Sequence, residues 1–173
     1  MDYIILNTIS SWRTDFLDRF FFAITDLGHW FVIAIVLLIV LLFLNLYKKS
    51  HLINYFIVVV VGAGLTNTLI KFLIHRARPT SDLALYVEKF PSFPSAHSAL
   101  AFAFYGFLIY YVCRFKMNIF LKIFFIALFV AVILLVGFSR LYLGVHFPTD
   151  VLGGYLVGLL WVCVGIYLAH YRF

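Results

Sequence analysis

Three clusters of polar residues interrupt an otherwise apolar chain, and each contains side chains that bind anions or transfer protons. In the first cluster, Lys71 precedes Arg78 by seven residues, which is close to two turns of an α-helix. Both cations can therefore project along one helix face toward a single anion, and Pro79 then turns the chain out of the helix. His75 and Arg76 lie nearby and are candidates for contacts with the rest of a ligand. Taken alone, the cluster is explained more simply by basic residues that reach toward a membrane interface.

The second cluster, Pro94 to Ser98, opens a predicted helix. Ser95 is placed to cap this helix, and the backbone N–H groups that follow form an anion site at the positive end of the helix dipole. His97 lies in this first turn. A lone histidine at such a place is more often interfacial than catalytic, but a histidine beside an anion site is a candidate for catalysis.

The third cluster consists of Ser139, Arg140, His146 and Asp150. His146 and Asp150 are four residues apart near the start of a predicted helix, whose first turn tolerates Pro148. A carboxylate one turn away can accept the proton of one imidazole nitrogen and leave the lone pair of the other nitrogen ready to attack. A purely structural His–Asp hydrogen bond would not explain the nearby arginine.

Together the clusters supply three cations, a set of helix N–H groups and two histidines, which is what phosphoryl transfer requires. One histidine would attack phosphorus, and the other would protonate the departing oxygen and then act as a base toward water. The residues alone leave His97 and His146 interchangeable in these roles, although the Asp150 partner favours His146 as the nucleophile. We expect neither a metal ion nor a cofactor in this chemistry.

The composition places these clusters in a membrane protein. Of 173 residues, 65% are hydrophobic and 12% are charged, whereas soluble domains carry about 25% charged residues. The apolar residues form separate runs near the length that spans a bilayer, so we predict an all-α membrane helix bundle with one domain, residues 1–173. The net charge of +6 is typical of cytoplasmic loops and of binding to phosphate-bearing lipids. We expect no nucleic-acid partner and no obligate protein partner.

Five transmembrane helices are predicted, at residues 28–47, 52–74, 96–113, 119–138 and 148–170. Over residues 1–24, apolar residues at helical spacing alternate with charged ones, which predicts an amphipathic helix in the membrane interface. Small residues in the second and fifth spans predict close helix packing, and the glycines among them are Gly62, Gly64, Gly153, Gly154 and Gly158.

The charges sort onto two sides when the five spans alternate in direction. One side carries only basic residues, namely Lys48, Lys49, Arg114, Lys116, Lys122 and Arg172. The other side carries the remaining seven basic residues and all the acids, namely Asp2, Asp15, Asp18, Asp26, Asp82, Glu88 and Asp150. By the positive-inside rule the first side is cytoplasmic. All three polar clusters fall on the second side, which is periplasmic or extracellular in a bacterial inner membrane.

The three clusters resemble the signature of the type 2 phosphatidic acid phosphatases (PAP2), which share their active site with vanadium-dependent haloperoxidases. The signature reads K-x6-RP, PSGH and SR-x5-H-x3-D, and the spacings are kept here at Lys71–Pro79, Pro94–His97 and Ser139–Asp150. Ala96 stands where the pattern usually has glycine. The resemblance covers residues 52 to about 170, and the six helices usual in the family match the interfacial helix plus five spans.

The resemblance implies a role for each matching residue. His146 corresponds to the nucleophile that forms a phosphohistidine, Asp150 to the residue that orients it, and His97 to the acid that protonates the leaving group. The phosphate ligands implied by the resemblance are Lys71, Arg78, Ser95, Ala96 through its backbone N–H, and Arg140.

The expected activity is that of a membrane lipid phosphatase. Because the connections around the site are short, a bulky head group could enter it sideways, which favours lipid A 1-phosphate and undecaprenyl diphosphate over phosphatidylglycerol phosphate and phosphatidic acid. Two alternatives are a catalytically silent lipid-binding or transport protein and a haloperoxidase-like oxidase. The presence of both His97 and His146 disfavours the first alternative, and the membrane spans disfavour the second.

Overall fold

The computed structural model describes residues 2–46, 52–80 and 82–170. Within these ranges the chain forms seven α-helices and no strand. The helices are α1 (Asp2–Ser10), α2 (Asp15–Asp26), α3 (Trp30–Leu46), α4 (Ile53–Ile74), α5 (Ala96–Arg114), α6 (Ile119–Tyr142) and α7 (Pro148–His170). Lys48, Lys49 and Arg172, assigned above to the cytoplasmic side, lie outside the described residues.

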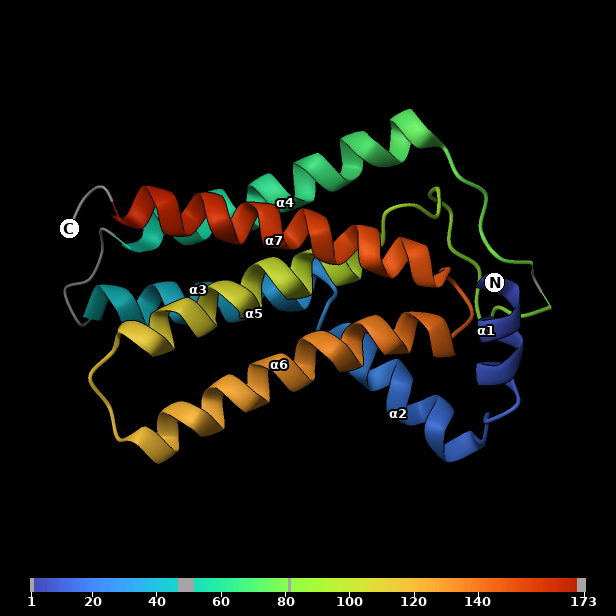
Figure 1. Ribbon diagram of the computed structural model, residues 1–173, viewed down its shortest axis with the longest axis horizontal. Coiled ribbons are helices and arrows are strands. Elements are labelled where there is room, and N and C mark those ends of the chain that lie inside the picture. Colours follow the sequence, from blue (N-terminus) through green and yellow to red (C-terminus); the bar gives the residue numbers. More distant parts are fainter. Residues whose placement is uncertain (1, 47–51, 81, 171–173) are drawn as a thin grey trace.

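Long apolar helices run side by side along the long axis of the molecule (Figure 1). Four of the described helices, α4 to α7, are each long and apolar enough to cross a membrane, and α2 with α3 makes a fifth candidate span that is bent by 53°. Large apolar side chains point outward, as at Leu69 and Leu156, which are 60% and 66% exposed. Such a surface is stable in lipid and costly in water. The predicted all-α, multi-pass membrane bundle is confirmed.

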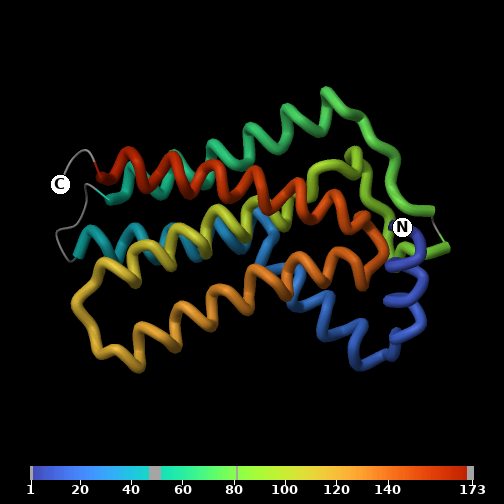
Figure 2. Tube along the Cα trace, viewed as in Figure 1, coloured from blue at the N-terminus to red at the C-terminus, as the bar shows by residue number. Residues whose placement is uncertain are grey.

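The N-terminal segment differs from the single amphipathic helix predicted for residues 1–24. The chain breaks before Thr14, whose side chain caps α2, and two helices result. Arg13 at the break donates hydrogen bonds to the carbonyl oxygen of Tyr142, a tertiary contact that hydrophobic periodicity does not reveal. Only α1 lies across the end of the bundle, whereas α2 packs on α6 and leads into α3 (Figure 2).

Glycines bring α7 close to α5 and thereby join two parts of the site. A Cβ atom at Gly154 would lie 2.5 Å from the carbonyl oxygen of Ser95, and one at Gly158 would lie 2.7 Å from that of Ala99. No side chain fits at such distances, so the close packing predicted from these glycines is confirmed. At this contact the N–H of Ser95 donates to the carbonyl oxygen of Asp150 at 2.9 Å.

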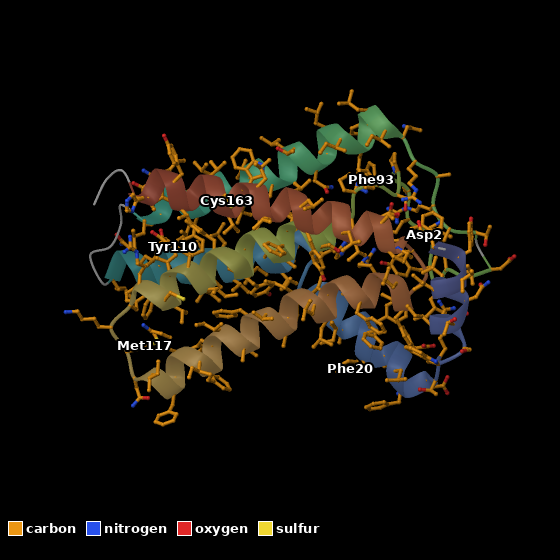
Figure 3. All side chains as sticks on the ribbon, viewed as in Figure 1. Asp2, Phe20, Phe93, Tyr110, Met117 and Cys163 are labelled. Carbon is orange, nitrogen blue, oxygen red and sulfur yellow. The ribbon has the colours of Figure 1, made fainter. Side chains whose placement is uncertain are left out.

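The loop between α4 and α5 and the turn between α6 and α7 lie at the same end of the bundle as α1 (Figure 1). Figure 3 places Asp2 at this end and Met117, between α5 and α6, at the opposite end. The turn before α7 requires Gly144, which has a φ of +72° and would place a Cβ atom against the backbone of Leu83. The three polar clusters therefore share one end of the molecule.

Candidate active site

The three polar clusters meet at one cavity of about 690 Å³. It lies between the α2–α3 junction, α4, the first turn of α5 and the loop that joins α4 to α5. The predicted site residues that line it are Lys71, Arg78, Ala96, His97 and His146. Ser95, Arg140 and Asp150 are fully buried and do not line this cavity.

His146 is buried in the turn before α7, and both of its ring nitrogens have partners. Nδ1 lies 3.5 Å from Oδ2 of Asp150 and 3.4 Å from the hydroxyl of Ser92, while Nε2 lies 3.3 Å from Nη1 of Arg78. A guanidinium only donates hydrogen bonds, so Nε2 carries the lone pair and Nδ1 carries the proton. Burial lowers the pKa of His146 to about 3. The imidazole is therefore neutral at ordinary pH, with its lone pair on Nε2.

Both carboxylate oxygens of Asp150 accept hydrogen bonds. Oδ2 accepts from the hydroxyl of Ser92 and, at 2.8 Å, from the N–H of Phe147. Oδ1 accepts from Nη1 of Arg76 at 2.7 Å. Because these donors hold the carboxylate in one orientation, the carboxylate in turn fixes the ring of His146.

Arg76 does not lie where the predicted contact with a lipid head group would place it. Besides Asp150, its guanidinium binds Asp2 of α1, with 3.0 Å between Nη2 and Oδ2, and the hydroxyl of Thr149, at 2.6 Å from Nη1. Arg76 does not line the cavity. His75 ends α4 in a left-handed conformation, is exposed, and also lies outside the cavity lining. The structure therefore brings neither residue into the cavity, and it makes Arg76 a support of Asp150.

Lys71 and Arg78 line the cavity and also hold the loop that closes it. Nζ of Lys71 donates to the carbonyl oxygen of Pro91 at 2.6 Å. Arg78 donates to the carbonyl oxygens of Phe90 and Val145, both at 2.7 Å. These bonds fold the loop around the two cations, which the sequence placed two helical turns apart. The second of those turns is absent, because α4 ends at Ile74.

Arg140 is buried and makes contacts with three side chains. Nη1 donates to the hydroxyls of Thr25 and Tyr86, both at 2.7 Å, and Nη2 lies 2.6 Å from Oε1 of Glu88. Glu88 also approaches Arg78, with 3.4 Å between Oε2 and Nη2. Burial alone would raise the pKa of Glu88, but the two arginines outweigh it and the pKa lies below its usual value. Glu88 is therefore an anion within the site.

The start of α5 places His97 in the cavity. The centroid of its ring lies 5.6 Å from that of His29 at the α2–α3 junction, which also lines the cavity. Ser95 caps α5, as predicted, and its oxygen accepts a hydrogen bond from the N–H of Ser98. Ala96 lines the cavity beside His97. The structure thus brings both histidines to one cavity and gives Ser95 a capping role.

Four residues of the site were not predicted, namely Thr25, Tyr86, Glu88 and Ser92. Glu88 carried a signal, since it is the only glutamate of the chain and lies between the first two clusters. Ser92 lies three residues before the predicted cap and also bears a hydroxyl, but its spacing indicates no role. Thr25 and Tyr86 reach Arg140 only through tertiary packing, which no local pattern reveals.

A bound metal ion would need a cluster of ligands among the described residues. Among them, no group of three histidine, cysteine, aspartate or glutamate side chains is arranged to hold such an ion. Of the charged groups that line the cavity, Lys71 and Arg78 are cations that suit an anion, Glu88 is already paired with arginine, and Asp26 is an exposed acid at the end of α2.

The fold and the site define a multi-pass helical membrane protein with a buried histidine–aspartate pair beside a cavity that Lys71 and Arg78 line. The model of the PAP2 superfamily matches residues 51–173. The chain therefore belongs to the PAP2 superfamily.

Two relatives carry named activities. The chain is 42% identical over 99 residues to phosphatidylglycerophosphatase B of Bacillus subtilis, a match that covers 56% of this chain and 47% of the relative. It is 30% identical over 113 residues to lipid A 1-phosphatase of Rhizobium etli, a match that covers 60% of this chain and 44% of the relative. The chain thus spans about half the length of the curated relatives it matches.

Two solved structures are similar to this fold. The PAP2-type phosphatidylglycerolphosphate phosphatase of Bacillus subtilis superimposes with a TM-score of 0.89 and 32% identity, over 98% of this chain and 85% of that one. LpxE of Aquifex aeolicus superimposes with a TM-score of 0.74 and 23% identity, over 96% of this chain and 94% of that one. The second likeness concerns the fold alone.

Proposed function

We propose that the protein is a membrane lipid phosphatase that uses His146 as a nucleophile. The observation that carries this proposal is the neutral imidazole of His146, whose Nε2 lies 3.3 Å from a guanidinium nitrogen of Arg78 at the cavity. A lone pair beside a fixed cation is suited to attack a phosphate that the cation binds. Membership of the PAP2 superfamily and the names of the relatives support the same activity.

The proposed reaction has two steps. In the first, Nε2 of His146 forms a bond to phosphorus while the bond from phosphorus to the lipid oxygen breaks, and His97 donates a proton to that oxygen. In the second, His97 takes a proton from water as the water attacks phosphorus and releases orthophosphate from His146. Asp150 orients the imidazole and stabilises its positive charge in the intermediate. Lys71 and Arg78 neutralise the phosphoryl oxygens.

The lipid substrate is inferred from the position of the cavity and from the relatives. Apolar side chains line the cavity beside the charged ones, and examples are Leu65, Phe72 and Leu100. A lipid head group could therefore meet the cations while its chains contact apolar side chains. We place phosphatidylglycerol phosphate first, because the relative with 42% identity is named for it. Lipid A 1-phosphate comes next, followed by undecaprenyl diphosphate and phosphatidic acid.

We also propose that the active site faces the periplasm or cell exterior from a bacterial inner membrane. The connection at the far end of the bundle is flanked by basic residues without an acid, namely Arg114, Lys116 and Lys122. The cavity end, where Figure 3 labels Asp2, carries acids paired with bases, as in Asp2 with Arg76 and Glu88 with Arg78. The positive-inside rule supports this orientation. Cysteine introduced at position 82, after replacement of both native cysteines, should react in intact cells with a membrane-impermeant maleimide. Protection of that cysteine would reverse the orientation.

The activity is tested by orthophosphate release from the four lipids in detergent micelles, with and without a chelator. We expect His146→Ala to abolish release while the purified protein keeps its thermal transition. His75→Ala, an exposed histidine outside the cavity, is the matched control and should retain activity. Full activity of the His146 variant would refute the mechanism. Lipid binding without phosphate release by the wild type would instead favour a silent lipid-binding protein.

A further inference from the structure

Glu88 occupies the edge of the site where the resemblance implies that phosphate binds. Its carboxylate lies 2.6 Å from Nη2 of Arg140 and 3.4 Å from Nη2 of Arg78. The hydroxyl of Tyr86 adds a hydrogen bond of 3.2 Å to the same carboxylate. Two guanidiniums that the family signature assigns to phosphate are therefore joined by one internal anion.

The contacts of Arg140 show what this anion does. Glu88 and Tyr86 line the cavity, but Arg140, to which both are bonded, does not. Nε of Arg140 is buried and has no hydrogen-bond partner among the described residues. A buried guanidinium nitrogen without a partner is costly, and an oxyanion beside it would remove the cost. Nη2 of Arg140 is held by Glu88, so this nitrogen becomes available to a phosphate in the cavity when the Glu88 carboxylate moves.

We propose that Glu88 is a competing internal anion, whose carboxylate exchanges with the phosphate group of the substrate on Arg78 and Arg140. This inference rests on the proposed function for its meaning in turnover. The carboxylate leaves the guanidiniums when a phosphate monoester binds, and it returns when orthophosphate departs. Glu88 thus weakens the binding of product and speeds its release, at the expense of weaker substrate binding.

A carboxylate is suited to this exchange because it carries one charge and a phosphate monoester carries close to two. The phosphate dianion can displace the Glu88 carboxylate from the two guanidiniums, since its oxygens accept stronger charge-assisted hydrogen bonds. After hydrolysis, the tethered carboxylate is always near and competes without a cost in translational entropy. The exchange involves no covalent change in Glu88.

The first experiment measures binding of inorganic phosphate by calorimetry, with the purified protein in detergent. Glu88→Gln keeps the shape and an acceptor for Arg140 but removes the charge. We expect a dissociation constant for phosphate about tenfold lower than in the wild type, because a nearby anion no longer opposes binding. Asp82→Asn is the matched control: it removes one charge from an exposed acid in the same loop outside the cavity, and should change binding less than about twofold. Glu88→Ala should act as Glu88→Gln does.

A second measurement needs no variant. Because Glu88 is the only glutamate of the chain, labelling glutamate with ¹³C at the carboxyl carbon gives a single side-chain signal. We expect phosphate to shift this signal saturably, with the dissociation constant found by calorimetry. Unchanged or weaker phosphate binding in either folded Glu88 variant, or a glutamate signal that phosphate leaves unmoved, would overturn the proposal. Neither readout depends on turnover, so failure of the lipid phosphatase proposal would be recognised separately.

Discussion

Replacement of Arg76 distinguishes a residue that binds substrate from one that positions the catalytic machinery. Arg76 supplies the hydrogen bond of 2.7 Å to Oδ1 of Asp150, while Oδ2 keeps its bonds from Ser92 and Phe147. A hydrogen bond to a charged group contributes about 1.5–3 kcal/mol, and the remaining donors on Oδ2 place the loss near about 1.5–2 kcal/mol. If this loss appears in the transition state, Arg76→Ala lowers kcat by about 10- to 30-fold with KM nearly unchanged.

The assay is the rate of orthophosphate release as a function of lipid concentration in mixed micelles. Arg76→Lys should recover part of kcat, since one ammonium can reach Asp150 but cannot also bridge Asp2 and Thr149 as the planar guanidinium does. His75→Ala is the neighbouring control and should stay within about twofold of the wild type. A raised KM with an unchanged kcat in Arg76→Ala would refute the positioning role and restore the head-group contact predicted from the sequence.

Three further outcomes are expected. In the proposed mechanism His97 protonates the leaving oxygen, so His97→Ala should slow release from a lipid phosphate by about 100-fold or more. It should slow hydrolysis of 4-nitrophenyl phosphate, whose leaving group needs no proton, much less, and equal losses on both substrates would contradict the acid role. Burial lowers the pKa of His146 from 6.5 to about 3. Between these values the unfolded chain binds a proton that the folded protein does not, so the stability of the folded protein must fall as the pH decreases. The melting temperature of His146→Gln should fall less steeply with decreasing pH, and equal slopes for the variant and the wild type would contradict the assignment. Gly154→Ala should cost about 1–3 kcal/mol of stability by overpacking, because its Cβ would lie 2.5 Å from the carbonyl oxygen of Ser95. Gly64→Ala should melt like the wild type, because its Cβ would lie 3.8 Å from the nearest atom, in Leu100.

The motif spacings and the apolar runs of the sequence predict the main helices and several residues of the site. The observed helices α4 to α7 nearly coincide with the ranges 52–74, 96–113, 119–138 and 148–170. These elements are predictable because each is a long apolar run bounded by local signals, such as the cap at Ser95 and Pro148 in the first turn of α7. Lys71, Arg78, His97 and His146 were likewise predicted as site residues, and they share one cavity.

The remaining features depend on contacts between distant parts of the chain. The break before Thr14 is held by Arg13 bonded to Tyr142, far along the sequence. The position of Arg76 also depends on distant residues, because its partners Asp2 and Asp150 are both 74 residues away in the sequence. Hydrophobic periodicity reports which face of a helix is buried, but it does not report which residue a buried charge meets.

The bridge from Asp2 through Arg76 to Asp150 also sets an order of events during synthesis. α1 leaves the ribosome before the segment that carries Arg76, and α7 follows both. The link from Asp2 through Arg76 to Asp150 can therefore form only after α7 has been made. The hydrogen bonds of Asp150 are therefore complete only once α7 has docked, so the proposed machinery forms together with the closed bundle.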